Sequence, residues 1–308
     1  MVNVTVKDIN DNMIVLKDPV RLTVIRDIDA PAGGLEAEFY IKDTIPELKY
    51  ISVIRNSENV FSGNIDEQSI VKTSEGCRLI IRARSIEALL LDNEAMPQTY
   101  HLPSFGIIFE RHFRPLGFKG FKGSDKSFNG ELVISKGMSQ WAVLFAFCDQ
   151  FIGCRPFIDP EGIIDISGDH REMSFFIGQK IIRRIRTVYR RHSVISDITA
   201  RTYPAGGYKM NIKSNIAEKL EIKRKRYLNT VGTNIMGINA VRDMITRSDR
   251  SYKQTEIVCS GFINCRPDDT FTMEGSQETY RITEVIYSIK NGEDTIKVIS
   301  EEENNVAQ

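Results

Sequence analysis

The sequence predicts a β-rich α+β protein in which two small β-barrel-like sections flank a mixed α/β section. Two observations predict this class. Apolar and polar residues alternate at period two in the first and last thirds, and apolar residues recur at helical spacing in the middle. The 308 residues, 41% hydrophobic and 27% charged, are enough for about two to three domains of a folded protein. We therefore expect domains over residues 1–85, 86–178 and 179–308.

The first section shows the alternation most clearly. A strand is expected where apolar residues fall at every second position, at Leu35, Ala37, Phe39 and Ile41. The same pattern recurs from Cys77 to Ala83, with Arg78 and Arg82 between the apolar residues. The tripeptide Ser62-Gly63-Asn64 is interpreted as a turn. We interpret this section as a small barrel or sandwich.

Short helices are predicted at the start of the middle section. Ser85 is expected to cap a helix over residues 86–91, with Glu87 favourably placed in its first turn. Residues 104–113 form a second candidate helix, which a proline and a glycine end. Residues 118–130 are rich in Gly, Lys and Phe and are predicted to be a loop.

The strongest helix signal comes next. Its apolar residues recur at i, i+3, i+7 and i+10, at Met138, Trp141, Phe145 and Cys148. Gly153 is a natural C-terminal stop. A hairpin that turns at residues 159–162 is predicted to follow.

The last section returns to period two. Asn291-Gly292 between two apolar runs is a strong hairpin signal, and residues 239–250 have the spacing of a short helix. The other strand candidates are residues 181–190, 194–202, 208–212, 220–226, 255–263, 270–273, 280–289 and 295–299.

The sequence contains no recognisable catalytic, cofactor-binding or metal site. The four histidines have no metal-ligand spacing, no pair of the five cysteines has the gap of a zinc or redox site, and no phosphate-binding loop is present. His112 and His192 lie among basic residues, where solvated or locally hydrogen-bonded histidines are expected rather than catalytic ones. We therefore expect that the protein is not an enzyme and uses no cofactor.

A cell-wall hydrolase is one alternative, because a glycosidase or peptidase requires positioned carboxylates. The candidate carboxylates are Glu94, Glu110, Asp165 and Asp169. None has a supporting motif. Asp165 and Asp169 flank the end of a strand, where they are expected to shape a turn.

Charge is distributed unevenly, although the formal net charge is zero. Residues 180–226 contain 14 Lys and Arg against 3 Asp and Glu, which points to a charged surface or a charged partner. The candidate interface residues in this basic block are Arg184, Arg186, Arg190, Lys223, Arg224, Lys225 and Arg226. A nucleic-acid-binding β protein that uses the block is a second alternative. Aromatic residues are sparse beside it, so a protein-facing strand surface is favoured.

One segment has a familiar order of motifs. Gly76–Ser85, followed by Leu89–Ala95 and Pro97-Gln98, resembles the baseplate hub proteins of contractile phage tails and phage-tail-like bacteriocins, the late-control-protein-D-like hubs. In that family a barrel strand ends in an Arg-Ser step, and a short helix and an Asn-Glu-Ala-x-Pro-Gln stretch follow. Residues 266–269 depart from the family, which often has a Pro-Gly-Asp turn there. Further similar segments occur in the same order at residues 62–66, 138–148, 157–162, 283–288 and 295–298.

The resemblance implies a structural subunit that forms a homotrimer. Each chain would contribute two tube domains to a ring that joins a hexameric tail tube protein to a trimeric central spike protein. Tape-measure and baseplate wedge proteins are further expected partners, and nucleic acid is expected only in transit through the channel. Contacts between protomers would cover exposed phenylalanines of the 118–130 loop, including Phe118 and Phe121.

Two features of the sequence, together with the resemblance, bear on where the protein is located. The longest apolar run, residues 141–147, is too short to cross a bilayer, so no membrane segment is expected. The N-terminus lacks the basic start and apolar stretch of a secretory signal. We expect synthesis in the bacterial host cytoplasm and incorporation into the baseplate of a virion or tail-like particle. If the protein were instead the cell-wall hydrolase considered above, it would act at the tail tip.

Overall fold

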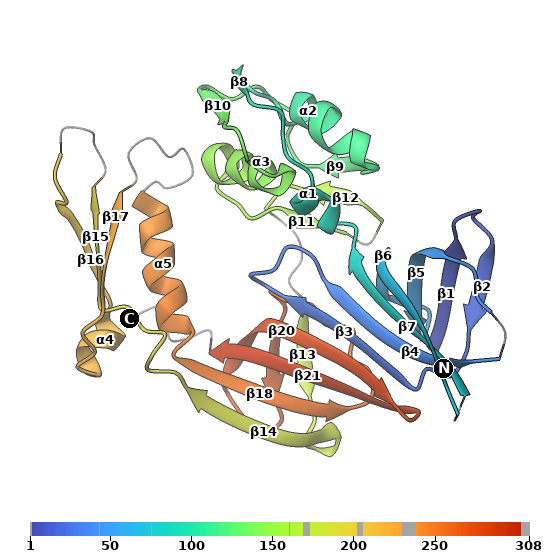
Figure 1. Ribbon diagram of the computed structural model, residues 1–308. Helices are drawn as coiled ribbons and strands as arrows, with labels where there is room; N and C mark the ends of the chain where they lie inside the picture. Colours follow the sequence, from blue (N-terminus) through green and yellow to red (C-terminus); the bar gives the residue numbers. More distant parts are fainter. Residues whose placement is uncertain are drawn as a thin grey trace.

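The computed structural model describes residues 2–42, 44–74, 76–159, 161–168, 173–201, 206–229 and 238–302. Strands predominate and helices are concentrated in the middle of the chain, so the predicted β-rich α+β class is confirmed (Figure 1). The first section consists of strands β1 (Val2–Asp8), β2 (Met13–Leu16), β3 (Arg21–Asp27), β4 (Gly34–Ile41), β5 (Leu48–Arg55), β6 (Glu58–Thr73) and β7 (Gly76–Ser85).

The middle section packs short strands around helices. Its helices are α1 (Ala88–Asp92), α2 (Phe105–Ile108) and α3 (Gln140–Phe147), and π-helical turns extend the last two over Phe109–Phe113 and Cys148–Ile152. A 3-10 turn over Arg114–Leu116 follows the first of these extensions. Its strands are β8 (Gln98–His101), β9 (Gly120–Lys122), β10 (Glu131–Ile134), β11 (Phe157–Ile158) and β12 (Ile163–Asp165).

The last section contains long strands and a smaller body of three strands and two helices. Six strands of this section belong to the large sheet described below: β13 (Ser174–Ile177), β14 (Ile182–Tyr189), β18 (Lys253–Ser260), β19 (Thr270–Met273), β20 (Thr279–Lys290) and β21 (Glu293–Glu302). A 3-10 turn spans Gln179–Ile181. The small body consists of β15 (Asp197–Arg201), β16 (Met210–Lys213), α4 (Asn215–Lys219), β17 (Lys225–Asn229) and α5 (Ile238–Arg250).

A single sheet unites the two β sections. Strand β20 pairs antiparallel with β3, from Glu284 opposite Asp27 to Lys290 opposite Arg21. The sheet therefore runs β14-β18-β21-β20-β3-β4-β7-β6-β5-β1-β2 (Figure 1). Off this path, β19 pairs with β20, and β13 pairs with β19. Within the described ranges no pairing closes either section into a barrel. Instead the path is open, with β14 at one end and β2 at the other.

The core of the first section depends on this union. Alternate residues of its strands are fully buried, as their period-two pattern predicts, and Phe39, Phe61 and Leu79 are among the largest. Tyr287 and Ile289 of β20 belong to the same apolar cluster. The two β sections therefore share core contacts as well as backbone pairing.

Three predicted strands of the last section form a separate body. Residues predicted as strands 194–202, 208–212 and 220–226 supply β15, β16 and β17, which pair with one another in the order β16-β15-β17. We call residues 193–201, 206–229 and 238–251 the insert. Its core contains Ile198, Ala200, Val241 and Ile245, and the insert stands beside the large sheet (Figure 1). The expectation that these strands belong to a second barrel is wrong.

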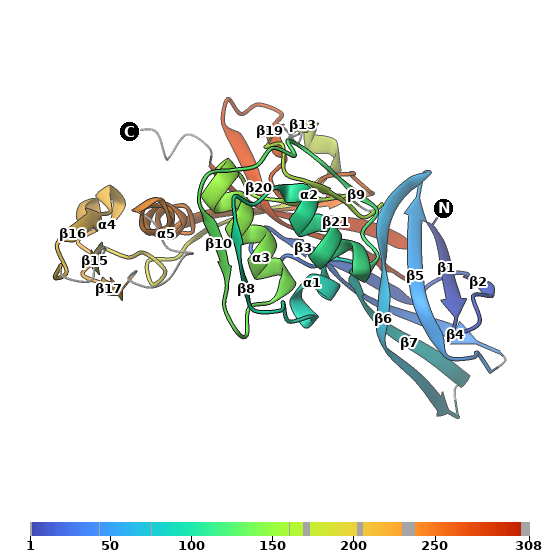
Figure 2. The same cartoon turned by 90° about the horizontal axis from the view of Figure 1, so that it is seen from above.

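The middle section lies over one side of the large sheet when the molecule is viewed from above (Figure 2). Its helix starts follow from capping, since Ser104 and Ser139 accept hydrogen bonds from the backbone N–H groups of Ile107 and Ala142. Ser85 does not cap α1; instead its hydroxyl accepts the Gly33 N–H at 2.9 Å. Glu87, expected in the first turn, is the residue that precedes the helix.

The turn predicted at Ser62-Gly63-Asn64 is wrong, because Gly63 lies inside β6, where it pairs with Ser85 of β7 and Ile51 of β5. The loop predicted over residues 118–130 is irregular for most of its length, but residues 120–122 form β9, which pairs in parallel with β12. By contrast, the hairpin at Asn291-Gly292 is confirmed, with both residues at positive φ.

Candidate functional site

The first group of basic residues lies on β14, an edge strand of the large sheet. Arg184 and Arg186 are exposed, and Arg186 Nη1 lies 3.4 Å from Glu256 Oε2, a carboxylate that is only 5% exposed. Arg190, just after the strand, lines a cavity of about 470 Å³ beneath helix α5. This group therefore flanks the sheet edge and a cavity entrance.

The second group, Lys223–Arg226, lies on the insert and not on the large sheet. Arg224 is a structural residue, because its Nη1 donates to Val194 O at 3.2 Å and its backbone N–H donates to Ser196 Oγ at 2.9 Å. Lys225 Nζ lies 3.8 Å from Asp197 Oδ1. The basic block of the sequence is thus two surfaces on two bodies.

The phenylalanines expected to be exposed are packed inside the middle section. Phe118 is 1% exposed, so the expectation that a contact between protomers covers its side chain is wrong. Phe121 is partly buried, and its ring lies 4.9 Å from that of Phe105 in an edge-on arrangement. Strand β9 turns this segment inward, which composition alone did not indicate.

His112 is also buried, so of the two expected states the solvated ring is wrong and the ring is hydrogen-bonded instead. Its Nδ1 lies 2.8 Å from Gln140 Oε1, and its Nε2 lies 3.0 Å from the Tyr100 hydroxyl. Burial lowers the pKa of His112 below its ordinary value, and the nearby Arg111 acts in the same direction. The ring is therefore a neutral structural link between β8, the α2 extension and α3.

A pH dependence follows from this link. Because the folded-state pKa of His112 is depressed, the unfolded chain binds a proton that the folded chain does not, and stability falls as pH drops below about 6.5. We expect His112→Gln to be less stable than the parent at pH 7.5 and to lose less stability between pH 7.5 and 5.5. Urea unfolding at both pH values measures this, and parallel losses in the two proteins would contradict it.

The carboxylates considered for hydrolysis do not converge on one site. Glu94 Oε1 accepts the Gly137 N–H at 2.8 Å, and Glu110 forms an ion pair with Arg114 at 2.6 Å. Asp165 Oδ1 accepts from the N–H and hydroxyl of Ser167, as a turn-shaping residue does. Asp169 lies outside the described residues. In the parts of the chain that the structure describes, no three metal-ligating side chains cluster.

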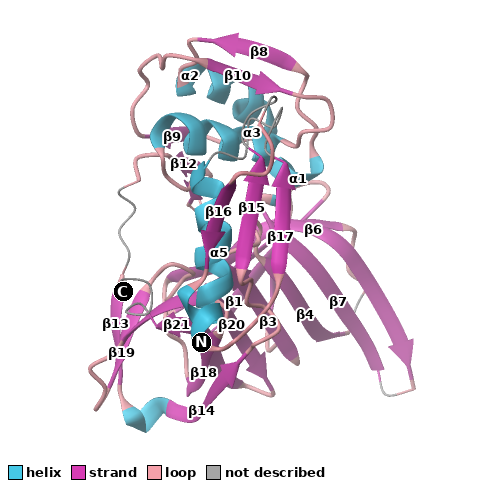
Figure 3. Cartoon of the chain, turned by 90° about the vertical axis from the view of Figure 1, so that its left-hand side faces the viewer, coloured by secondary structure: helices cyan, strands magenta, loops and turns pink. Residues whose placement is uncertain are grey.

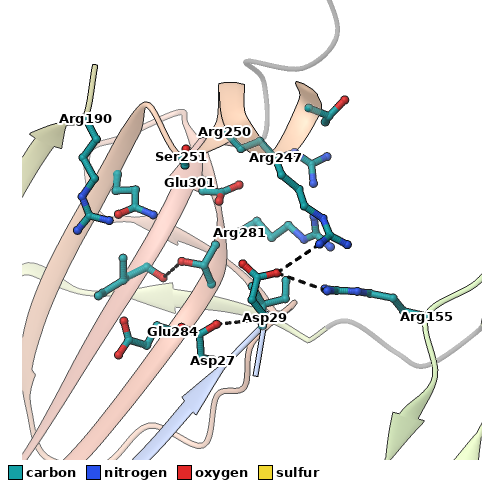
Figure 4. Close-up of a pocket in the computed structure, with 15 residues that line it drawn as sticks. Asp27, Asp29, Arg155, Arg190, Arg247, Arg250, Ser251, Arg281, Glu284 and Glu301 are labelled. Carbon is teal, nitrogen blue, oxygen red and sulfur yellow. Dashed lines mark hydrogen bonds and ion pairs between the residues drawn. The ribbon is translucent and has the colours of Figure 1, made fainter. Parts of the chain in front are cut away.

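A charged contact that the sequence did not indicate joins the large sheet, the middle section and the insert. We call it the joint. Asp29 Oδ1, in the β3–β4 loop, is 3.5 Å from Arg155 Nη2 of the middle section and 3.8 Å from Arg247 Nη1 of α5 (Figure 4). Arg250 and Arg281 line the same 470 Å³ cavity. Burial raises the pKa of Glu301 there, and the charges of Arg250 and Arg281 oppose that shift. No local motif marks the joint, because its residues come from distant segments.

A second cavity, of about 630 Å³, adjoins the joint. It is lined by apolar rings, including Trp141 and Phe157, and by the charged residues Arg26 and Glu87. Burial lowers the pKa of Arg26 to about 10 and raises the pKa of Glu87. The two groups come from β3 and from the connection between β7 and α1, and the opposite charge of each partly offsets the effect of burial on the other.

Both ends of the sheet present apolar side chains to solvent. On β2, Met13 and Val15 are 69% and 60% exposed, and on β14, Ile185 and Tyr189 are 51% and 59% exposed. Unpaired strand edges with exposed apolar residues are templates for pairing with another chain. The two edges are therefore candidate assembly surfaces.

None of the helices in the described portion of the chain has the length and apolar character needed to cross a bilayer. No protein-family model matches the sequence, and no curated protein sequence matches it significantly.

The fold matches solved structures over almost the whole chain. The 43 kDa tail protein of prophage MuSo2 from Shewanella oneidensis has a TM-score of 0.77 at 15% identity, covering 97% of this chain and 98% of that one. A tail protein from Neisseria meningitidis MC58 has a TM-score of 0.75 at 13% identity, with 99% and 98% covered. The E. coli c3393 protein, a type VI secretion system component with structural similarity to T4 tail proteins gp27 and gp5, has a TM-score of 0.56 at 11% identity, with 92% and 73% covered. The chain therefore has the fold of these tail proteins.

Proposed function

We propose that this chain is a structural hub subunit of a contractile phage-type tail baseplate. Three copies would form a ring that adapts a hexameric tail tube to a trimeric central spike. In this proposal the chain has no catalytic role, is made in the bacterial host cytoplasm and becomes part of a virion or tail-like particle.

The observation that carries the proposal is the single open sheet. Its two ends, β2 and β14, each have a free edge with exposed apolar side chains. Two different surfaces on one chain favour a head-to-tail contact, and such contacts give rings when the rotation closes. Two similar β sections per chain would let three copies present six comparable units to a hexameric tube.

The shared fold supports the same role. Proteins with this fold include phage tail proteins and a type VI secretion system component. The hydrolase alternative has no comparable support, because the described candidate carboxylates are engaged with a backbone N–H, an arginine and a serine.

Light scattering of the purified chain tests the proposal, with a trimer as the expected mass. Val15→Lys and Ile185→Lys each place a charge at a free edge and should raise the concentration for half-assembly at least about tenfold. Met96 is 75% exposed on the middle section, so Met96→Lys is the matched control and should leave assembly unchanged. A monomer at high micromolar concentration, with no ring on addition of the tube protein, would refute the ring.

A further inference from the structure

We infer that the outer face of the insert's three-stranded sheet docks an acidic surface of a different protein in the tail particle. We define the outer face by Asn211, Lys213, Lys225 and Tyr227, together with Asp197 and Thr199 of the central strand β15. The inference rests on the proposed function, because it places the partner inside the assembled tail.

The pairing register of the insert defines this face. Asp197 lies opposite Lys213 on one side and Lys225 on the other, and Thr199 lies between Asn211 and Tyr227. The alternate residues Ile198 and Ala200 face the other way and are fully buried against helix α5. One side of the sheet is therefore core, and the other is free of the insert's own helix α5.

The outer face points away from the rest of the molecule. In Figure 1 the strands lie on the far side of α5 from the large sheet, and in Figure 3 they lie in front of it. The insert joins the sheet where β14 ends and β18 begins, and Asp29 braces it through Arg247. The proposed contacts between copies use β2 and β14, so this face remains available to another protein.

The charge of the insert favours an acidic partner. Residues 193–251 contain 11 Lys and Arg against 5 Asp and Glu. On the outer face Lys213 and Lys225 are exposed, whereas the carboxylate between them, Asp197, is only 10% exposed. The exposed charges on this face are therefore those of the two lysines, and complementary charge sets partner choice and association rate.

A tyrosine pair supplies the apolar part of the contact. The rings of Tyr208 and Tyr227 lie 5.8 Å apart at 90°, and the residues are 48% and 66% exposed. Tyrosine is enriched among the residues that dominate protein interfaces. In such an edge-to-face pair the edge of one ring covers a face of the other, whereas bases of a nucleic acid stack on open ring faces. This geometry favours a protein over a nucleic acid.

Photo-crosslinking in assembled particles tests the inference. We would replace Tyr227 with p-benzoylphenylalanine, purify the tail particles, irradiate them and identify the product by mass spectrometry. The expected product joins this chain to a different tail protein through an acidic segment. Lys213→Gln with Lys225→Gln should lower its yield about tenfold, since each lysine contributes a long-range charge contact.

Two matched controls make the result specific. Phe176 on β13 is 69% exposed, so the same photoreactive residue there should not give this product. Lys219 is exposed on α4, off the outer face, and Lys219→Gln should leave the yield unchanged. A product with nucleic acid or with a second copy, or no product from particles that contain the chain, would overturn the inference alone. Absence of the chain from purified particles would overturn the proposed function as well.

Discussion

Gly63→Ala is expected to destabilise the large sheet by at least about 3 kcal/mol, because the added methyl group has no space. A Cβ at Gly63 would lie 2.7 Å from the carbonyl carbon of Arg84 and closer still to its oxygen. Both atoms belong to the backbone of β7, which is held on its other side by β4. Relief would therefore require β6 and β7 to separate. Thermal or urea unfolding measures the loss.

The matched control is a glycine two strands away in the same sheet. Gly34 on β4 has nothing within 4 Å of its Cβ position. Gly34→Ala should change stability by less than about 1 kcal/mol, because it removes backbone freedom without a clash. Equal losses in the two variants would mean that close approach of β6 and β7 is not what selects glycine at position 63.

Tyr287→Ala is expected to cost about 3–5 kcal/mol and to loosen the first β section, although Tyr287 lies near the other end of the sequence. The side chain is 2% exposed, packs in the first-section core and contacts the Phe262 ring at 5.1 Å. It lies opposite Val24 on β3. Hydrogen exchange should therefore show faster exchange in β3 as well as in β20.

The control for this prediction keeps the ring. Tyr287→Phe should cost less than about 1 kcal/mol, because the buried area is nearly unchanged. If Tyr287→Ala sped exchange only in β20 and β21 and left β3 protected, the two β sections would be energetically independent and the shared core would be refuted.

Features that depend on local pattern were predictable from the sequence. Buried positions alternate at Leu35, Ala37 and Phe39, and the second helix starts beside Ser104 as capping chemistry requires. The hairpin at Asn291-Gly292 has the same local origin. In each case the deciding interactions lie within a few residues along the chain.

Features that depend on distant contacts were not predictable in this way. Nothing near His112 indicates that Gln140 and Tyr100 will enclose its ring. The joint at Asp29 likewise requires Arg155 and Arg247, which neither periodicity nor spacing relates to it. Period-two patterning also cannot assign a strand to a sheet, so the insert strands were placed in the wrong body.

The pairing of β3 with β20 has a consequence for synthesis on the ribosome. Strand β3 ends at Asp27, but the partner for its free edge, β20, begins at Thr279 and is translated much later. Until then the nascent chain carries an unpaired edge and an incomplete core, both of which favour aggregation. Such long-range pairing also slows folding, since distant segments must meet before their contacts form. The first β section should therefore reach its native protection only after β20 has left the ribosome.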